Sequence, residues 1–249
     1  MAWLMFLGSI FVLWVASLLK IIHVTYTGSK SGFLKSDDHR NVLLVIAHPD
    51  DESMFFTPTI NYLISLGHNL HILCLSNGNA DGLGDTRNRE LYQACAVLKI
   101  PLNQVKVLDH PDLQDGFGNV WNRDLVAKVI KEDVVSHAID LIITFDNYGV
   151  SGHCNHRDLN HGIRRFLNDT SVEAWELVST NMLRKYSGPF DIWLSHLSAR
   201  GETHCLLNEK PFKTYLAMAQ HSSQWLWFRK LFVFFSSYSY VNVLKKINN

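Results

Sequence analysis

Hydrophobic and polar positions divide the chain into a long apolar start, a polar stretch, and a region where short apolar runs alternate with amphipathic segments. Residues 2–19 carry no charged side chain, whereas residues 23–40 are mostly polar. At a rise of about 1.5 Å per residue, the first stretch covers nearly the whole hydrocarbon core of a bilayer, and Ile21 and Ile22 extend it. The pattern predicts a transmembrane anchor at residues 1–22 and a linker at residues 23–40.

A cleaved signal peptide is the alternative interpretation of the first segment. Signal peptides normally begin with basic residues and have a shorter apolar region, and this segment has neither feature. Basic residues follow the apolar stretch and none precedes it: Lys20, Lys30, Lys35 and Arg40. The positive-inside rule therefore predicts a single-pass protein whose large C-terminal part faces the cytosol.

From residue 41 onwards, apolar runs alternate with segments of helical periodicity. Four runs have the length and composition of buried strands, at residues 41–47, 69–76, 103–109 and 139–145. Helices are expected between them, at about residues 52–66, 86–100 and 120–138. This alternation predicts an α/β fold with a Rossmann-like, doubly wound and mostly parallel sheet. If the strand order is 3-2-1-4, the first and fourth strands are neighbours, and ligands bind beyond their carboxyl ends.

The end of the chain is harder to interpret from its pattern. The later elements are expected to be strands at residues 176–180 and 203–208 and a helix at residues 209–224. Together with the first four strands, they define an expected catalytic domain at residues 41–224. Residues 225–249 are rich in aromatic side chains and contain Arg229 and Lys230, a combination typical of the membrane–water interface. A helix that completes the domain is the alternative for this tail.

Composition is that of an ordinary globular domain. The 249 residues contain 23 basic and 23 acidic side chains, so there is no basic excess that would indicate nucleic acid binding. The four cysteines, at positions 74, 95, 154 and 205, show no Cys-x-x-Cys spacing. Reduced thiols in a cytosolic domain are therefore expected.

Two charged clusters follow the first and the fourth expected strand. The first, "HPDDE", begins at His48, and the second, "HCNH", covers His153–His156. If the two strands are neighbours, both clusters lie at one crevice. Zinc in a catalytic site takes three nitrogen or oxygen ligands and keeps a fourth position for water. His48, Asp51 and His156 would supply such a set of ligands.

The remaining groups of the two clusters suit the hydrolysis of an amide. Asp50 is expected to act as the general base that removes a proton from the metal-bound water. His153 is expected to stabilise an oxyanion and to protonate the leaving amine. Helix capping is the alternative role for Asp50 and Asp51 taken alone. Two histidines and one carboxylate also describe an iron(II) oxygenase site, although such sites usually lie on antiparallel barrels.

The stretches "AHPDDE" and "GVSGHCNH", each after a strand, resemble those of the zinc-dependent N-acetylglucosaminyl deacetylases of the LmbE/PIG-L type. The resemblance covers about residues 41–228. The apolar N-terminus, "TRNREL" and "HSSQWLWFRKLF" resemble the eukaryotic branch of this family. The resemblance implies hydrolysis of N-acetylglucosaminyl-phosphatidylinositol to glucosaminyl-phosphatidylinositol and acetate. It also implies a place early in glycosylphosphatidylinositol-anchor biosynthesis, at the cytosolic face of the endoplasmic reticulum membrane.

The resemblance implies the residue roles already expected: zinc held by His48, Asp51 and His156, with Asp50 as general base and His153 as acid or oxyanion partner. Other divalent metals can occupy such a site. Arg87 matches a family arginine near the polar head of the substrate, where a guanidinium suits a phosphodiester. A surface role on its helix is the alternative for Arg87. His221 and Gln224 match a further family pattern, and helix packing is the alternative for both.

One position departs from the family pattern. Many soluble bacterial members have His-Pro-Asp-His where this chain has residues 153–156. A carboxylate there would orient the first histidine and raise its pKa, whereas Asn155 can orient it but lends no charge. His153 is therefore expected to act more as an oxyanion donor than as an acid. Two other functions stay open: a deacetylase of a soluble N-acetyl sugar conjugate, and a non-catalytic membrane adaptor that keeps the fold.

Overall fold

The structure is a computed structural model that describes residues 2–27, 31–35, 37–199 and 201–248. Within these residues the strands are β1 (Asn41–Ile46), β2 (Asn69–Cys74), β3 (Val105–Val107), β4 (Leu141–Phe145), β5 (Glu173–Leu177), β6 (Thr203–Leu207) and β7 (Val241–Lys246). Part of the expected linker, namely residues 28–30 (with Lys30) and residue 36, lies outside the described residues.

The described strands form one sheet in the order β3-β2-β1-β4-β5-β7-β6. Strands β1 to β5 are parallel, and β7 runs antiparallel to both of its neighbours. Every residue of β1 after Asn41 is buried, as expected for a strand covered on both faces. The doubly wound, mostly parallel sheet is thereby confirmed, and so is the order 3-2-1-4 of its first four strands.

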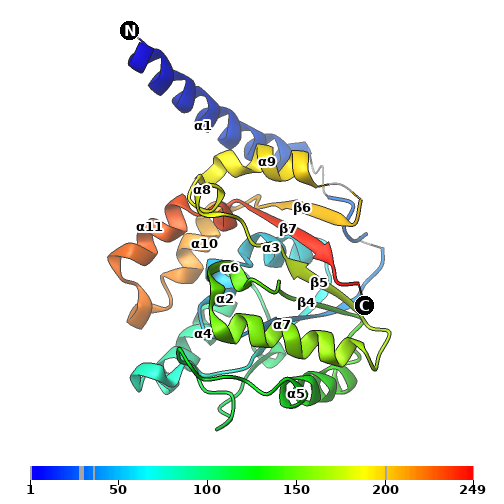
Figure 1. Ribbon diagram of the computed structural model, residues 1–249. Helices are drawn as coiled ribbons and strands as arrows, with labels where there is room; N and C mark the ends of the chain where they lie inside the picture. Colours follow the sequence, from blue (N-terminus) through cyan, green and yellow to red (C-terminus); the bar gives the residue numbers. More distant parts are fainter. Residues whose placement is uncertain (1, 28–30, 36, 200, 249) are drawn as a thin grey trace.

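Helices cover both faces of the sheet (Figure 1). The α-helices are α1 (Ala2–Thr27), α2 (Asp51–Met54), α3 (Thr57–Ser65), α4 (Gly84–Leu98), α5 (Arg123–Ser136), α6 (Gly149–Gly152), α7 (Cys154–Leu167), α8 (Met182–Lys185), α9 (Asp191–Ser198), α10 (Pro211–Met218) and α11 (Trp227–Phe235). Short 3₁₀ helices are η1 (Asn79–Asp81), η2 (Leu102–Gln104), η3 (Gly188–Phe190), η4 (Ser222–Gln224) and η5 (Ser237–Ser239). Right-handed crossovers place α3 and α4 on one face and α5 and α7, which pack on each other, on the opposite face.

The helix expected at residues 52–66 is divided into α2 and α3. Phe55 and Phe56 interrupt it, and Pro58 stands in the first turn of α3. Proline has no N–H to donate, so this residue type is suited to a new helix start and not to a helix interior. The break turns the chain directly after the acidic cluster and keeps α2 short. Helix α7 begins directly after His153 and contains His156, and it was not among the predicted elements.

The expected tail after residue 224 contributes to the domain instead of standing apart from it. Strand β7 pairs with β5 and β6, and its Leu244 is fully buried. Only α11 within this segment presents a row of exposed aromatic side chains. The end of the chain therefore completes the sheet, and the aromatic surface belongs to one helix.

Helix α1 extends from the body of the molecule in Figure 1 and is long and apolar enough to cross a membrane. It continues five residues beyond the expected end of the anchor. Its first half is exposed, whereas Ser17 and Ile21 are buried against the domain. Ile21 belongs to a small apolar cluster with Ile192, Tyr240 and Val241. Thus the helix is docked on the domain by its C-terminal half.

Candidate metal and active site

The two charged clusters meet beyond the carboxyl ends of the adjacent strands β1 and β4. They line a pocket of about 800 Å³ with two unlike walls. The polar wall consists of His48, Asp50, Asp51, Arg87, Asp115, His153 and His156. The apolar wall consists of Met54, Phe55, Tyr186, Phe228, Leu231, Phe232 and Phe235. The crevice predicted from the strand order is therefore present, and both charged and apolar side chains line it.

Asp51 lies between the two histidines expected to share a cation with it. Its Oδ1 is 3.2 Å from Nε2 of His156, and its Oδ2 is 3.9 Å from Nδ1 of His48. Oδ2 also accepts the backbone N–H groups of Ala47 and His48 at 3.0 and 2.9 Å. Burial alone would raise the pKa of Asp51, but the charges and hydrogen bonds of His156 and His48 outweigh it and lower that pKa. The carboxylate is thus ionised and fixed in place.

His156 is held by its own helix and by the loop before it. Its Nδ1 lies 3.1 Å from the carbonyl oxygen of Gly149, which can only accept a hydrogen bond, so Nδ1 carries the proton and Nε2 faces Asp51. The ring stacks on Phe145 at 4.0 Å between centroids. Gly149 has a φ of +67°, and a Cβ there would lie 2.6 Å from Cβ of His156. Glycine is therefore needed at this position for the histidine to approach.

His48 makes two further polar contacts that the sequence did not suggest. Its Nε2 lies 3.1 Å from Oδ1 of Asp115 and 3.2 Å from Oδ1 of Asn155. Burial lowers the pKa of His48, but the hydrogen bond with Asp115 and the charges of Asp51, Asp115 and Asp50 outweigh it, and the pKa is raised. Burial raises the pKa of Asp115. The hydrogen bond and the charge of His48, together with the charge of Arg87, outweigh burial and lower this pKa to about 2.

The donor atoms present fit a divalent cation. One ligand atom from each of His48, His153 and His156 lies within 4.8 Å of the other two. The carboxylate of Asp51 contacts two of these histidines directly. Nitrogen and carboxylate oxygen are the donors that zinc takes in catalytic sites, and a hydrogen bond on the far nitrogen, as in His156, orients such a ligand.

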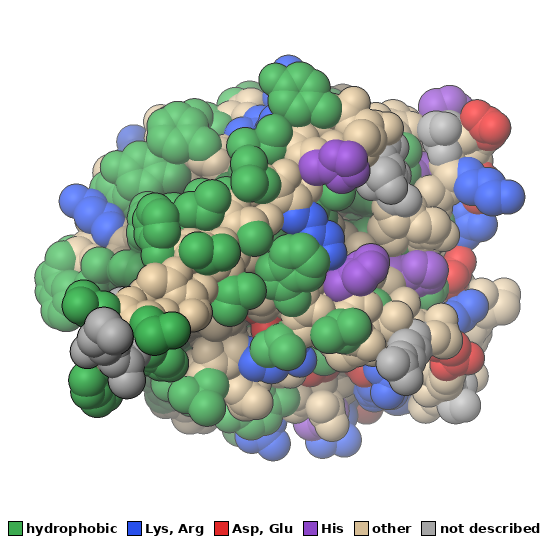
Figure 2. All heavy atoms as spheres, turned by 90° about the horizontal axis from the view of Figure 1, so that it is seen from above, with side chains coloured by type: hydrophobic (Ala, Val, Ile, Leu, Met, Phe, Trp, Pro, Cys, Tyr) green, Lys and Arg blue, Asp and Glu red, His purple; other side chains and the backbone are tan. Residues whose placement is uncertain are grey.

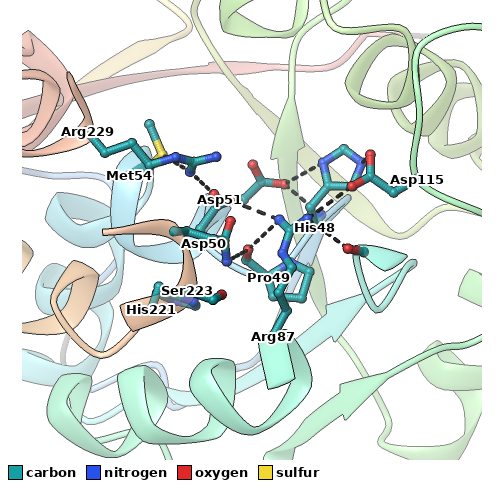
Figure 3. A network of polar contacts seen from close by, with 12 residues as sticks. His48, Pro49, Asp50, Asp51, Met54, Arg87, Asp115, His221, Ser223 and Arg229 are labelled. Carbon is teal, nitrogen blue, oxygen red and sulfur yellow. Dashed lines mark hydrogen bonds and ion pairs between the residues drawn. The ribbon is translucent and has the colours of Figure 1, made fainter. Parts of the chain in front are cut away.

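Asp50 stands beside this group in a strained backbone conformation. Its φ of 124° is rare for any residue other than glycine, so the surrounding structure must hold it there. Oδ2 forms an ion pair with Nη1 of Arg229 and lies 3.9 Å from Nη2 of Arg87. Figure 3 shows both guanidinium groups directed at this carboxylate. Asp50 is thus presented to the pocket between two cations.

The guanidinium of Arg87 connects the loops that form the polar wall. Nη1 donates to the carbonyl oxygen of Gly78 at 2.9 Å and to Oδ2 of Asp115 at 3.1 Å. Nη2 donates to the carbonyl oxygen of Pro49 at 3.0 Å. These bonds join the segments that follow β1, β2 and β3, so Arg87 fixes the shape of the wall. Arg229, by contrast, has no carbonyl partner among the described contacts and comes from α11.

His221 and Gln224 form hydrogen bonds with the segment of residues 48–52 that follows β1. Nε2 of His221 lies 2.7 Å from Oε1 of Glu52, and both side chains are fully buried. Oε2 of Glu52 accepts the N–H of Asp50 at 3.1 Å. Nε2 of Gln224 donates to the carbonyl oxygen of Pro49 at 3.2 Å. These contacts give Glu52 an orienting role, because the buried pair fixes the backbone at Asp50.

His153 lines the pocket and is half-buried. Its Nδ1 accepts the backbone N–H of Asn155 at 3.3 Å, so Nε2 carries the proton of the neutral ring. The side chain of Asn155 contacts His48 and the carbonyl oxygen of Asn119, so it is the backbone of Asn155 that orients His153. Burial, and then the charges of His48 and His156, lower the pKa of His153 to about 4.

Sequence reasoning missed two charged residues of this site. Asp115 follows β3 in a polar loop, and the rule that parallel strands end at one edge of the sheet would have pointed to it. Arg229 reaches Asp50 from α11, near the end of the chain. No local pattern in the sequence links these two positions.

Comparison with known proteins places this geometry in a family. The family model for PIG-L, GlcNAc-PI de-N-acetylase, matches residues 43–167. The chain is 36% identical over 241 residues to the "Probable N-acetylglucosaminyl-phosphatidylinositol de-N-acetylase" of Dictyostelium discoideum, covering 84% of this chain and 93% of the relative. It is 41% identical over 206 residues to the "N-acetylglucosaminyl-phosphatidylinositol de-N-acetylase" of Bos taurus, covering 81% of each.

Solved structures with little sequence identity have the same fold. An N,N'-diacetylchitobiose deacetylase from Pyrococcus horikoshii superposes with a TM-score of 0.60 at 13% identity, over 85% of each chain. The zinc-inhibited form of a teicoplanin deacetylase gives a TM-score of 0.57 at 12% identity, over 84% of this chain and 99% of that one. The matched family model and the long, similar relatives decide the assignment: the chain belongs to the PIG-L family of GlcNAc-PI de-N-acetylases.

Proposed function

We propose that this protein is a metal-dependent de-N-acetylase of N-acetylglucosaminyl-phosphatidylinositol, which it converts to glucosaminyl-phosphatidylinositol and acetate. The observation that carries the proposal is the contact of Asp51 with both His48 and His156, with Asp50 at the same pocket. The names of the relatives supply the substrate. In this proposal the reaction is an early step of glycosylphosphatidylinositol-anchor biosynthesis.

His48, Asp51 and His156 would hold the cation, which is zinc or another divalent metal. When bound, the cation supplies an acidified water and polarises the acetamide carbonyl. Asp51 is preferred over His153 as the third ligand because its carboxylate contacts both other ligands and is fixed by two backbone N–H groups. His153 is only half-buried, whereas the three ligands are buried, and this leaves it free for the substrate.

Asp50 is assigned as the general base. Its carboxylate lines the pocket one residue before Asp51, and its backbone is fixed by the bond to Glu52. Oδ2 is engaged by Arg229, so Oδ1 is the atom that accepts the proton of the attacking water. The two nearby guanidinium groups orient this carboxylate before the substrate binds.

His153 is assigned as the partner of the developing oxyanion. Because its pKa is about 4, the ring is neutral at physiological pH, with the proton on Nε2. A neutral N–H directed into the pocket donates a hydrogen bond to the oxygen of the tetrahedral intermediate. This supports the role of oxyanion donor expected from the missing carboxylate at position 155.

The two walls of the pocket suit the two parts of a glycolipid. The N-acetyl sugar would lie against the polar wall, and the phosphodiester would lie near Arg87 and Arg229. Arg87 already donates to two carbonyl oxygens and to Asp115, so Arg229 has more freedom to bind phosphate. The aromatic residues of α11 would face the lipid part.

In this proposal α1 is the single transmembrane anchor, in the membrane of the endoplasmic reticulum, with the catalytic domain in the cytosol. Its length and apolar composition support the span. The basic residues after the span, among them Lys20, Lys35 and Arg40, support the orientation. The substrate of the relatives is a membrane lipid, which agrees with this placement.

Acetate release from N-acetylglucosaminyl-phosphatidylinositol by the purified full-length protein tests the function. We expect turnover that a chelator abolishes and added zinc restores. Soluble N-acetylglucosamine conjugates provide a parallel substrate. If the protein turned over only those conjugates, the glycolipid assignment would be wrong, and if the metal-replete protein released no acetate from either substrate, it would be a non-catalytic member of the family.

A further inference from the structure

Helices α8, α9 and α11 present apolar side chains to the outside, and α11 also lines the pocket. On α8, Met182 and Leu183 are 65% and 86% exposed. On α9, Leu194 and Leu197 lie on the outer face. On α11 the exposed residues are Trp227, Phe228, Leu231, Phe234 and Phe235. We call these three helices the apolar face.

Figure 2 views the molecule from the side on which α1, α8, α9 and α11 lie, and hydrophobic side chains are grouped over the left and the centre of that view. Acidic side chains gather mostly towards the right of the same view, whereas Lys and Arg side chains are spread over it. A contiguous surface of this kind is uncommon on a soluble monomer and indicates a partner. Other exposed apolar residues include Leu102 and Val135, on separate elements, and Phe212, Tyr215 and Leu216, on α10.

The apolar face carries no exposed carboxylate. In α8, α9 and α11, all of which the structure describes, Asp191 is the one acidic residue, and it is 1% exposed. It pairs with Arg184 at 2.6 Å, which joins α8 to α9. The exposed charge is the cation of Lys230, next to the ring of Trp225. Aromatic rings with cations and no acids suit phospholipid headgroups.

The contacts between α1 and α9 determine how deep the apolar face would lie in a membrane. Nε1 of Trp193 in α9 donates to Oγ of Ser17 at 2.9 Å, and Nζ of Lys20 lies 4.3 Å from the Trp193 ring centroid. The undocked part of α1, up to Ala16, rises about 20 Å, whereas the hydrocarbon core is about 30 Å thick. A helix that crosses the hydrocarbon core of the bilayer must therefore include Ser17. Because Ser17 contacts α9, α9 lies at the edge of the hydrocarbon core.

We infer that α8, α9 and α11 rest in the membrane–water interface beside α1, so that the pocket opens directly onto the lipid headgroups. The occupant of the apolar face is the bilayer itself, because α1 continues from that face into it. This inference rests on the proposed use of α1 as a membrane span.

The inference explains why α11 belongs to both the pocket and the surface. Phe228, Leu231 and Phe235 line the pocket and are each about half exposed, so they form its rim. Trp227 and Phe234 lie on the same helix but outside the pocket. The headgroup of a lipid can thus reach the polar wall of the pocket while its acyl chains stay in the bilayer.

Photolabelling of the full-length protein in phospholipid vesicles tests the placement. The probe is phosphatidylcholine with a diazirine near the carbonyl end of one acyl chain, and labelled peptides are identified by mass spectrometry. We expect labels in α1 and also in α8, α9 and α11, with none in α5, whose exposed Val135 is the control. Labels confined to α1 would overturn the inference and leave the anchor intact. A lack of label in α1 as well would reject the anchor and the inference together.

A double variant tests the same surface through kinetics. Trp227→Ser with Phe234→Ser removes two exposed rings that do not line the pocket, and Val135→Ser is the matched control. We expect kcat/KM to fall about tenfold on vesicle-borne glycolipid and to stay within about twofold on a short-chain, soluble analogue. Equal effects on both substrates would contradict the inference. So would a dimer of the solubilised protein that the double variant abolishes, because a second copy would then cover the face.

Discussion

Arg229 of α11 forms an ion pair with Asp50, although the two residues stand at opposite ends of the domain in sequence. Asp50 belongs to the acidic loop after β1, and Arg229 to the helix whose other residues form the apolar rim of the pocket. The pair therefore links the expected base with the surface that we place at the membrane. A substrate phosphate that takes over Arg229 would release the carboxylate.

Replacement of Arg229 by alanine is expected to change KM for a charged substrate much more than KM for an uncharged one. KM for N-acetylglucosaminyl-phosphatidylinositol should rise about tenfold or more, because a charge-assisted hydrogen bond to phosphate is lost. KM for an uncharged N-acetylglucosamine conjugate should change much less. Steady-state kinetics of acetate release measures KM for both substrates.

Lys131→Ala is the control for this prediction, since this cation on α5 is exposed and does not line the pocket. An equal loss of kcat on both substrates in Arg229→Ala would mean that Arg229 serves Asp50 and does not bind the phosphodiester.

Replacement of Asp50 by asparagine removes the proton acceptor while keeping the size of the side chain. We expect kcat to fall by a factor of about 10²–10⁴, as for the loss of a general base, with the bound metal retained. Acetate release and metal content by atomic emission spectroscopy give the two readings. Asp112→Asn, at a largely exposed carboxylate, is the control. Near-normal turnover by the metal-replete Asp50→Asn protein would remove Asp50 from the mechanism.

Gly149→Ala is expected to weaken metal binding through His156. The new Cβ would lie 2.6 Å from Cβ of His156, so the histidine must move. Gly82→Ala is a matched control, because Gly82 has a similar φ of +73° but no atom within 4 Å of the added Cβ. Zinc affinity measured by competition with a chromogenic chelator should fall in the first variant and not in the second. Equal affinities would show that the contact with Gly149 does not position the ligand.

The buried pair of His221 and Glu52 predicts a pH-dependent stability. Burial lowers the pKa of His221, but the charge and hydrogen bond of Glu52 outweigh it, so the pKa is raised above its ordinary value of 6.5. The stabilisation is then fully present below about pH 6.5 and is lost as the pH rises through the raised pKa. Removal of one partner of such a pair costs about 3 kcal/mol of unfolding free energy.

Thermal unfolding of the detergent-solubilised protein at several pH values measures this effect. The loss of stability in His221→Gln should be larger at pH 6 than at pH 9, while His110→Gln, on a loop, should show no such trend. If the loss in His221→Gln grew with rising pH, the sign of the coupling would be wrong.

The sequence predicted those parts of the fold that follow from short-range patterns and from topology. The apolar runs before His48 and before the histidines at 153 and 156 were identified as strands, and the assumed strand order 3-2-1-4 made them neighbours. This brought His48 and His156 to one crevice, as the structure shows. The divided helix at Phe55–Phe56 was missed because the proline start signal at Pro58 was outweighed by helical periodicity.

Contacts between distant segments could not be predicted in the same way. Arg229 reaches Asp50 only because α11 folds back over the pocket, and the strand of residues 241–246 joins the sheet between two earlier strands. Insertion into the sheet depends on the space left by β5 and β6, which no local pattern reports. The aromatic content of the last residues pointed to a surface, and in the structure that surface is confined to α11.

The most direct test of the metal centre is an anomalous-scattering map from crystals of the zinc-loaded protein, recorded at the zinc absorption edge. The account predicts one strong peak within bonding distance, about 2.0–2.2 Å, of nitrogen atoms of His48 and His156 and of a carboxylate oxygen of Asp51. It also predicts that Asp50 lies beside the metal without binding it. A peak bound by other residues, or no peak in this pocket, would contradict the account.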